Sequence, residues 1–335
     1  QTDETAAEGV IFAPAFTVMR LFGKTIILIL ALLLGALCVH LFTFSTVGTD
    51  TDLDYMRQFS ERYRIFSLSL PQDLTFCDEP VPMGKIDVRE RLDRELLVNT
   101  YWQSNSVLAH KRANRWFPVI GPILEREGVP DDLKYIALIE SGLTNAVSPM
   151  GATGYWQFMK ETGAKYGLEI NAEVDERYNV VRSTEAACAY LKAAHAKYGS
   201  WAMAAASYNL GPGGLDKQVG RQKSNDYFSL LLPEETSRYV FRILAMKAII
   251  TDPERYGFHL RKKDLYPTYR TREVPITGPI EDLNDFATRQ GTDYKTLKLL
   301  NPWLRDIALA NAKGTTYTVL LPGEGFDKPV EDDER

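Results

Sequence analysis

The most informative part of the sequence is YIALIESGLTNAVSPMGATGYWQFM, residues 135–159. Its first part has apolar side chains on almost every side of a helical turn, which indicates a helix buried on most sides. The acid Glu140 comes at the end of this apolar run, and Gly142 follows two residues later. Glycine permits a tight turn and the close approach of a ligand. The sequence therefore predicts a short buried helix that carries one carboxylate to a glycine-rich turn.

The spacing of the helix places Glu140 on an apolar face. Leu133, Ile136 and Ala137 form an i, i+3, i+4 stripe, and Glu140 is its i+7 member. An ionised carboxylate there is unfavourable, so we expect the group to be hydrogen-bonded, paired, or protonated because its pKa is raised. A carboxyl that stays protonated near neutral pH suits a general acid for glycosidic bonds. A helix-end glutamate that satisfies local backbone groups is the alternative.

Two nearby motifs favour sugar chemistry. GYWQ, residues 154–157, offers Trp156 and Gln157, and aromatic faces and amides recognise sugar rings and hydroxyls. Core packing is the alternative for Trp156. ASYNLGPGG places Tyr208 and Asn209 at a helix end before glycines, where polar groups can converge on a cleft.

These motifs resemble, in the same order, those of the family 1 lytic transglycosylases, which have a goose-type-lysozyme-like (SLT) catalytic domain. The family pattern is Glu-Ser, then Gly-Leu-Met-Gln, then Ala-Tyr-Asn-Ala-Gly, then Glu-Thr-x-x-Tyr-Val. The corresponding residues here are 140–141, 154–157, 207–211 and 235–240. Tyr155 and Trp156 replace Leu-Met, and Leu210 replaces Ala, which puts the preference for sugar subsites in doubt more than the chemistry.

The resemblance implies cleavage of the MurNAc–GlcNAc β-1,4 bond of peptidoglycan without water and without a cofactor. Glu140 would protonate the leaving oxygen and then act as a base while the C6 hydroxyl of MurNAc closes a 1,6-anhydro ring. Tyr208 would hydrogen-bond the Glu140 carboxyl and orient it. The implied substrate-binding residues are Ser141, Trp156, Gln157, Asn209 and Tyr239.

Two other functions stay open at this point. A hydrolytic lysozyme-type muramidase would need a second carboxylate or a positioned water. The next acid in the sequence is Glu161, and no motif marks it. A non-catalytic cell-wall-binding protein is the other alternative, although a degenerate site would be expected to lose Glu140 and Tyr208.

Composition excludes several classes of partner and ligand. The net charge of -5 gives no reason to expect nucleic acid. The three cysteines, Cys38, Cys77 and Cys188, form no C-x-x-C pair, so no zinc site is indicated. The four histidines are scattered without the spacing of metal ligands. We expect a monomer with no metal and no cofactor; a Cys77–Cys188 disulfide stays open.

The N-terminal region carries a localisation signal. Residues 25–44 form a run without acid, Lys or Arg, long enough to cross a bilayer as a helix, and Arg20 and Lys24 precede it. We predict a signal anchor over residues 19–44, with a cleaved signal peptide as the alternative, after an upstream extension at 1–18. Either reading places the rest of the chain on the periplasmic side of the cell envelope, membrane-anchored or exported.

The predicted fold class is mainly α, with a small α+β domain at the end. A spacer over 45–86 precedes an all-helical lysozyme-like domain over 87–252, where charged and apolar residues alternate at helical spacing. Residues 265–323 predict the order strand, helix, helix, strand, and residues 324–335 form a tail.

The small domain resembles a LysM domain, a glycan-binding βααβ fold. The matching stretches are TRQGTDYKTLKLLNP and TYTVLLP. GPIEDLN stands where the Gly-Asp-Thr-Leu of the family is usual, so glycan binding by this domain is left open. The order of anchor, catalytic domain and LysM-like domain resembles the membrane-bound, D-type lytic murein transglycosylases.

Overall fold

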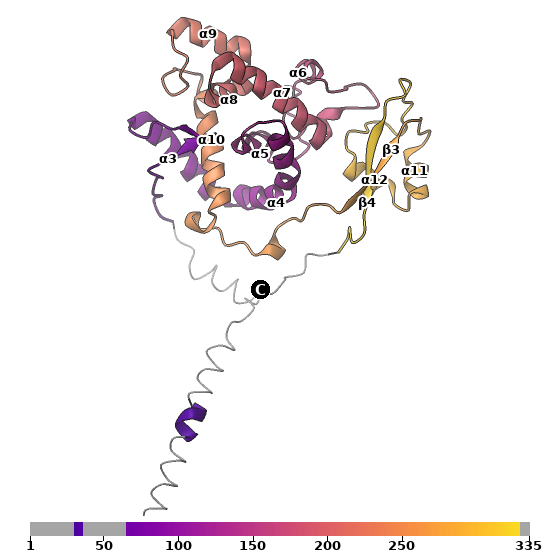
Figure 1. Ribbon diagram of the computed structural model, residues 1–335, viewed down its shortest axis with the longest axis horizontal. Helices are drawn as coiled ribbons and strands as arrows, with labels where there is room; N and C mark the ends of the chain where they lie inside the picture. The colour runs from indigo at the N-terminus through magenta and orange to yellow at the C-terminus, as the bar shows by residue number, and fades with distance from the viewer. Residues whose placement is uncertain (1–29, 36–64, 329–335) are drawn as a thin grey trace, which may run out of the picture. The chain divides into compact units, whose positions relative to one another are not determined.

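The computed structural model describes residues 30–35 and 65–328 (Figure 1). The described residues from 66 onward belong to one compact unit. Of the helices in these described ranges, none combines the length and the apolar character needed to cross a membrane. The predicted extension at 1–18 lies outside the described residues, as do most of the predicted anchor and the end of the predicted tail.

Eight α-helices build the larger domain of the described chain. They are α3 (Ile86–Tyr101), α4 (Gln103–Arg126), α5 (Lys134–Ser141), α6 (Lys160–Lys165), α7 (Val180–Tyr198), α8 (Trp201–Leu210), α9 (Pro212–Gln222) and α10 (Glu234–Thr251). Helix α5 packs against α4 and α10, while α10 also contacts α3 and α8. Figure 1 shows the short α5 enclosed by these longer helices. The prediction of a mainly helical domain is confirmed.

The burial of α5 follows from its sequence. Its residues Tyr135, Ile136, Ala137 and Leu138 are all buried, so the apolar run contacts neighbours on nearly every side. The helix ends at Gly142, which has a left-handed backbone (φ 60°) that caps helices favourably when the residue is glycine. The last turn of this buried helix therefore places the Glu140 carboxylate at the edge of the core.

Part of the predicted spacer belongs to the helical domain. Strands β1 (Thr75–Phe76) and β2 (Glu79–Pro80) form a small antiparallel hairpin. Phe76 and Val81 are buried in the same apolar core as the helices. Two-residue strands are too short to leave a periodic pattern in the sequence, which is why the hairpin was not predicted.

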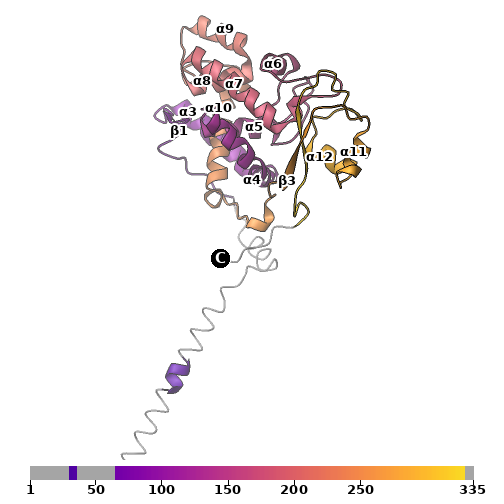
Figure 2. The same cartoon turned by 45° about the vertical axis from the view of Figure 1, so that its right-hand side comes forward.

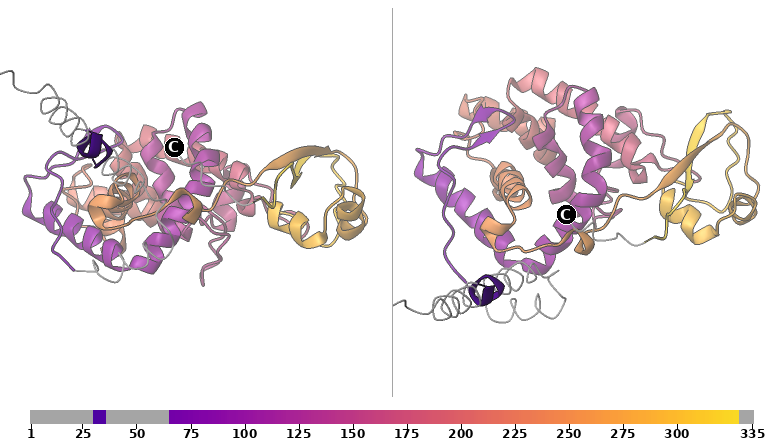
Figure 3. Two further views of the ribbon diagram at one scale, coloured as in Figure 1. Left: turned by 90° about the horizontal axis from the view of Figure 1, so that it is seen from below. Right: turned by 60° about the horizontal axis from the view of Figure 1, so that its bottom comes forward.

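The C-terminal domain has the predicted order of strand, helix, helix, strand. Strand β3 (Thr271–Ile276) pairs antiparallel with β4 (Tyr317–Pro322). Helices α11 (Leu283–Arg289) and α12 (Tyr294–Leu300) pack on each other, and α12 contacts β4 (Figures 2 and 3). Its apolar core is separate from that of the helical domain.

A buried ion pair fastens α10 to α3. The Glu95 side chain is 2% exposed and lies 2.7 Å from Nε of Arg238. Arg94, which is about half exposed, also reaches the same carboxylate at 2.6 Å. Because Tyr239 follows Arg238 directly on α10, this pair helps to set the position of that tyrosine.

Replacing Arg238 by Ala should destabilise the protein strongly, by about 3 kcal/mol, because the Glu95 carboxylate then stays buried with weaker compensation. Arg94→Ala is a matched control on the same carboxylate, and its greater exposure predicts a loss under about 1 kcal/mol. Chemical denaturation gives both free energies of unfolding. Equal losses for the two variants would contradict this role of Arg238.

Candidate active site

Glu140 is held at the junction of α5 and α10. The Tyr239 hydroxyl donates to Oε1 of Glu140 at 2.5 Å. One turn further along α10, Nη2 of Arg242 donates to the Ile139 carbonyl at 2.8 Å. Helix α10 therefore contacts both the acid and the backbone immediately before it, which restricts the orientation of the carboxyl.

The surroundings of Glu140 favour its protonated form. Burial raises the pKa of the Glu140 carboxyl, and the Glu235 carboxylate adds to that rise. The Tyr239 hydrogen bond and the Arg242 guanidinium act in the opposite direction, yet the net pKa stays above its usual range. Glu140 nevertheless keeps partial exposure. A carboxyl that is protonated and still reachable can transfer a proton to a bound molecule.

The tyrosine that contacts Glu140 differs from the one expected. The family resemblance implied this hydrogen bond for Tyr208, but the Tyr208 hydroxyl donates to the Trp156 carbonyl at 2.7 Å. A phenol has one proton to donate, so Tyr208 cannot also donate to Glu140 in this arrangement. Burial and then the nearby Glu140 raise the pKa of Tyr208 well above its usual value. Tyr239, expected to contact substrate, is fully buried and makes the bond instead.

Trp156 lies in the core and not on a binding surface. Its side chain is 0% exposed, and its indole Nε1 donates to Oγ1 of Thr184 at 2.9 Å. The expected stacking of a sugar ring on Trp156 therefore does not fit the structure. A tryptophan in a short motif gives no signal of which side it faces, because the same residue type serves cores and sugar platforms.

Ser141 and Gln157 both fasten the loop between α5 and α6, residues 142–159, which we call the active-site loop. The Ser141 hydroxyl lies 2.8 Å from the Tyr155 carbonyl. Nε2 of Gln157 donates to the carbonyls of Ala146 (3.0 Å) and Gly154 (2.8 Å). Gln157 has φ 50°, a conformation that non-glycine residues adopt only where the surroundings enforce it. Contact of either side chain with substrate stays a prediction.

The side chain of Asn209 contacts a second carboxylate, that of Glu235. Nδ2 of Asn209 donates to Oε1 of Glu235 at 3.1 Å, and the Thr236 hydroxyl donates to Oδ1 of Asn209 at 2.7 Å. Glu235 is exposed, and its charge acts on the pKa of Glu140. Glu235 begins the motif at residues 235–240, but nothing in the sequence indicated a role for its side chain. Across the described ranges, no cluster of three or more His, Cys, Asp or Glu residues could hold a metal ion.

Two family models match this chain. Residues 120–230 match the model described as "Transglycosylase SLT domain". This matched region contains Glu140, the active-site loop and Asn209. Residues 272–325 match "Soluble lytic transglycosylase C-terminal LysM-like domain", which covers β3 to β4.

Curated proteins of Escherichia coli are similar over a longer stretch. "Membrane-bound lytic murein transglycosylase D" of strain K12 is 30% identical over 247 residues, which is 72% of this chain and 53% of that protein. The protein of the same name in strain O6:H1 shows the same identity and coverage. The chain thus spans about half the length of these curated relatives.

Glu140→Gln should raise the melting temperature at about pH 7.5 and have little effect at about pH 4. The folded-state pKa of Glu140 is raised, so the wild type loses stability as pH rises above the usual carboxyl pKa through the folded value. Gln carries no charge, and it avoids that loss. Calorimetry at the two pH values measures the difference.

The matched control is Glu161→Gln, which changes an exposed acid on α6. It should leave the melting temperature at both pH values close to that of the wild type. If Glu140→Gln behaves in the same way as this control, the burial of an unfavourable carboxylate is contradicted.

Proposed function

We propose that this chain, which contains an SLT transglycosylase domain followed by a LysM-like domain, is a peptidoglycan lytic transglycosylase. The observation that carries the proposal is the position of Glu140: it lies within the region that matches the SLT domain, at the end of the buried helix α5, and its carboxyl accepts a hydrogen bond from Tyr239 of α10. Most glycosidases use two carboxylates. One buried acid is sufficient when the substrate itself supplies the attacking hydroxyl. The similarity to lytic murein transglycosylase D supports this substrate class.

The proposed reaction uses Glu140 twice. Its protonated carboxyl donates to the oxygen between C1 of MurNAc and GlcNAc, the C1–O bond breaks, and GlcNAc leaves with a hydroxyl. The N-acetyl group of MurNAc stabilises the positive charge at C1. The Glu140 carboxylate then removes the proton of the C6 hydroxyl, whose oxygen bonds to C1. The product is a 1,6-anhydro ring, Glu140 is protonated again, and no water is consumed.

Tyr239 is a positioning residue in this scheme. Its hydroxyl bonds to the carboxyl in the resting protein, and the same bond would stabilise the carboxylate between the two proton transfers. Ser141 and Gln157 would shape the cleft through the active-site loop. Tyr208 and Trp156 would support it from the core side, and Asn209 would meet the substrate beside Glu235.

Hydrolysis is a second candidate function, because Glu235 provides a second carboxylate. Inverting glycosidases use a second carboxylate to activate a water. Glu235 is an exposed acid whose charge acts on Glu140, so a muramidase reaction at the same site is the second candidate. The two reactions differ in the sugar end that they leave.

The LysM-like domain offers a second place for wall contact. A cavity of about 490 Å³ opens beside the loop after β3 and is lined by residues that include Glu281, Asp282 and Arg289. This is where the sequence departs from the usual LysM motif. We propose that this cavity contacts glycan and that the contact only assists the SLT domain.

The proposed place of action is the cell envelope, because peptidoglycan lies there. The N-terminal anchor over residues 19–44 rests on the sequence alone. The printed name of the Escherichia coli relatives describes them as membrane-bound.

Products of peptidoglycan digestion test the function directly. Fragments made by the wild type should be lighter by one water than hydrolysis products and should resist borohydride, because an anhydro end has no reducible aldehyde. Glu140→Gln should lower the rate by at least about a hundredfold. Reducible ends in the mass spectra would instead assign hydrolysis, and binding without any product would assign a wall-binding role.

The pH dependence of kcat/KM tests the surroundings of Glu140. Activity should fall as pH rises through the Glu140 pKa, since the acid must carry its proton. Tyr239→Phe removes a contact that lowers this pKa, so the alkaline limb should move to higher pH. Glu235→Gln removes a charge that raises it, and the limb should move to lower pH. Shifts in the same direction for both variants would contradict the assignment.

A further inference from the structure

A short segment of the SLT domain is built into the LysM-like domain. This docking segment, residues 168–178, lies between α6 and α7. Its Val174 is 1% exposed and belongs to the apolar core of the LysM-like domain. Val174 and Leu304 form an antiparallel bridge, in which the Arg305 amide donates to the Glu173 carbonyl at 2.7 Å and the Asp175 amide donates to the Trp303 carbonyl at 2.9 Å.

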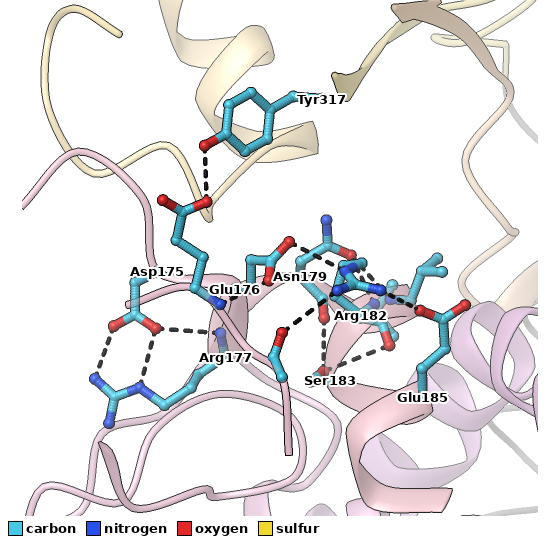
Figure 4. Close-up of polar contacts among 12 residues, drawn as sticks. Asp175, Glu176, Arg177, Asn179, Arg182, Ser183, Glu185 and Tyr317 are labelled. Carbon is cyan, nitrogen blue, oxygen red and sulfur yellow. Dashed lines mark hydrogen bonds and ion pairs between the residues drawn. The ribbon is translucent and has the colours of Figure 1, made fainter. Parts of the chain in front are cut away.

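Side chains reinforce this bridge. Tyr317 of β4 is labelled in Figure 4. Its hydroxyl donates to Oε2 of Glu169 at 2.8 Å. The guanidinium of Arg305 lies 4.0 Å from the centre of the Tyr178 ring. A buried apolar side chain, backbone bonds and charged contacts together indicate a fixed contact between the two domains and not a flexible tether.

The docking segment also supports the active-site loop. Nη1 of Arg177 donates to the carbonyls of Gly151 (3.2 Å) and Phe158 (3.3 Å). A Cβ at Gly154 would lie 1.8 Å from the Arg177 carbonyl oxygen, so the two backbones are in direct contact. Asp175 holds the Arg177 side chain through two hydrogen bonds of 2.9 and 2.7 Å (Figure 4).

Asp175 is therefore the link between the two domains. Its amide bonds to Trp303 of the LysM-like domain, and its carboxylate orients Arg177 against the loop that carries Gln157. Both side chains of the Asp175–Arg177 pair are about one-tenth exposed, so solvent weakens their attraction little. The backbone of Gln157 is in a conformation that needs such external support.

We propose that the LysM-like domain is part of the catalytic unit: by docking on residues 168–178 it holds Asp175 and Arg177 in place, and these two positioning residues set the active-site loop. The consequence for turnover rests on the proposed function. The mechanical coupling between the docking contact and the loop does not, and the two are tested separately.

Hydrogen exchange in the full chain tests the coupling. Val174→Asp places a carboxylate in the apolar core of the LysM-like domain and should undock it. The amides of Thr153, Gly154 and Phe158, which are hydrogen-bonded within the active-site loop, should then exchange at least about tenfold faster. Leu299→Asp is the matched control, since it makes the same kind of change at a position that is 51% exposed; it should leave these amides unchanged.

Unchanged protection of the loop would overturn the inference, provided that the Arg305 amide exchanges faster and so reports undocking. Asp175→Asn is the second variant, because it leaves the LysM core intact and only weakens the hold on Arg177. It too should speed exchange in the loop. If Val174→Asp unfolds the LysM-like domain altogether while the loop stays protected, the coupling is likewise excluded.

Kinetics on a soluble peptidoglycan fragment of two disaccharide units test the effect on turnover. Val174→Asp and Asp175→Asn should each lower kcat/KM by about fivefold or more, while Leu299→Asp should not. A domain that only binds the wall would leave this short-fragment value unchanged and raise KM on insoluble peptidoglycan alone, which would overturn the catalytic part of the inference. Absence of anhydro products from the wild type would overturn the proposed function, and the exchange result would still decide the coupling.

Discussion

The hydrogen bond from Tyr239 to Glu140 is the contact on which the rest of the site depends. It joins α10 to the last turn of α5 and makes the burial of an acid tolerable. The contacts around it support the same alignment, because Arg242 binds the backbone before Glu140 and the Arg238–Glu95 pair fixes α10 on α3. The opposing influences on Glu140 leave its pKa above the usual value. An acid that first donates and then accepts a proton, as we propose for Glu140, needs a pKa near the working pH.

Several motif residues around Glu140 use their polar groups to hold the site together. Ser141 and Gln157 use their polar groups on the active-site loop, and Trp156 faces Thr184 in the core. This distribution explains how an eight-residue helix and an irregular loop can keep one carboxyl in place. The support continues through Arg177 into the LysM-like domain, so the site is stabilised by a part of the chain distant in sequence.

Structural features that depend on residues close together in the sequence could be predicted from it. The apolar run before Glu140 predicted a short buried helix, and the alternation of residues at 265–323 predicted the order of strands and helices in the small domain. The spacing also placed Glu140 on the apolar stripe, which left a hydrogen bond, an ion pair or a raised pKa as the alternatives for its carboxyl.

Contacts between distant residues could not be predicted in the same way. Tyr208 and Tyr239 are both motif tyrosines, and only the packing of α10 on α5 decides which hydroxyl reaches Glu140. Val174 stands in the polar stretch NAEVDERY, so nothing in its neighbours indicates burial in another domain. For the same reason, the sequence left open whether the Trp156 side chain faces the core or a binding surface.

The proposed chemistry requires that Glu140 keeps its proton at a pH where ordinary carboxyls have lost it. Carbon-13 NMR of the side-chain carboxyls, with the Glu140 resonance assigned by its absence from Glu140→Gln, measures this directly. We expect this resonance to titrate above the usual glutamate pKa of about 4.3, because burial raises the pKa of Glu140. Titration at or below that value would show that the carboxylate is stabilised in the folded protein, and the assignment of Glu140 as the general acid would fail.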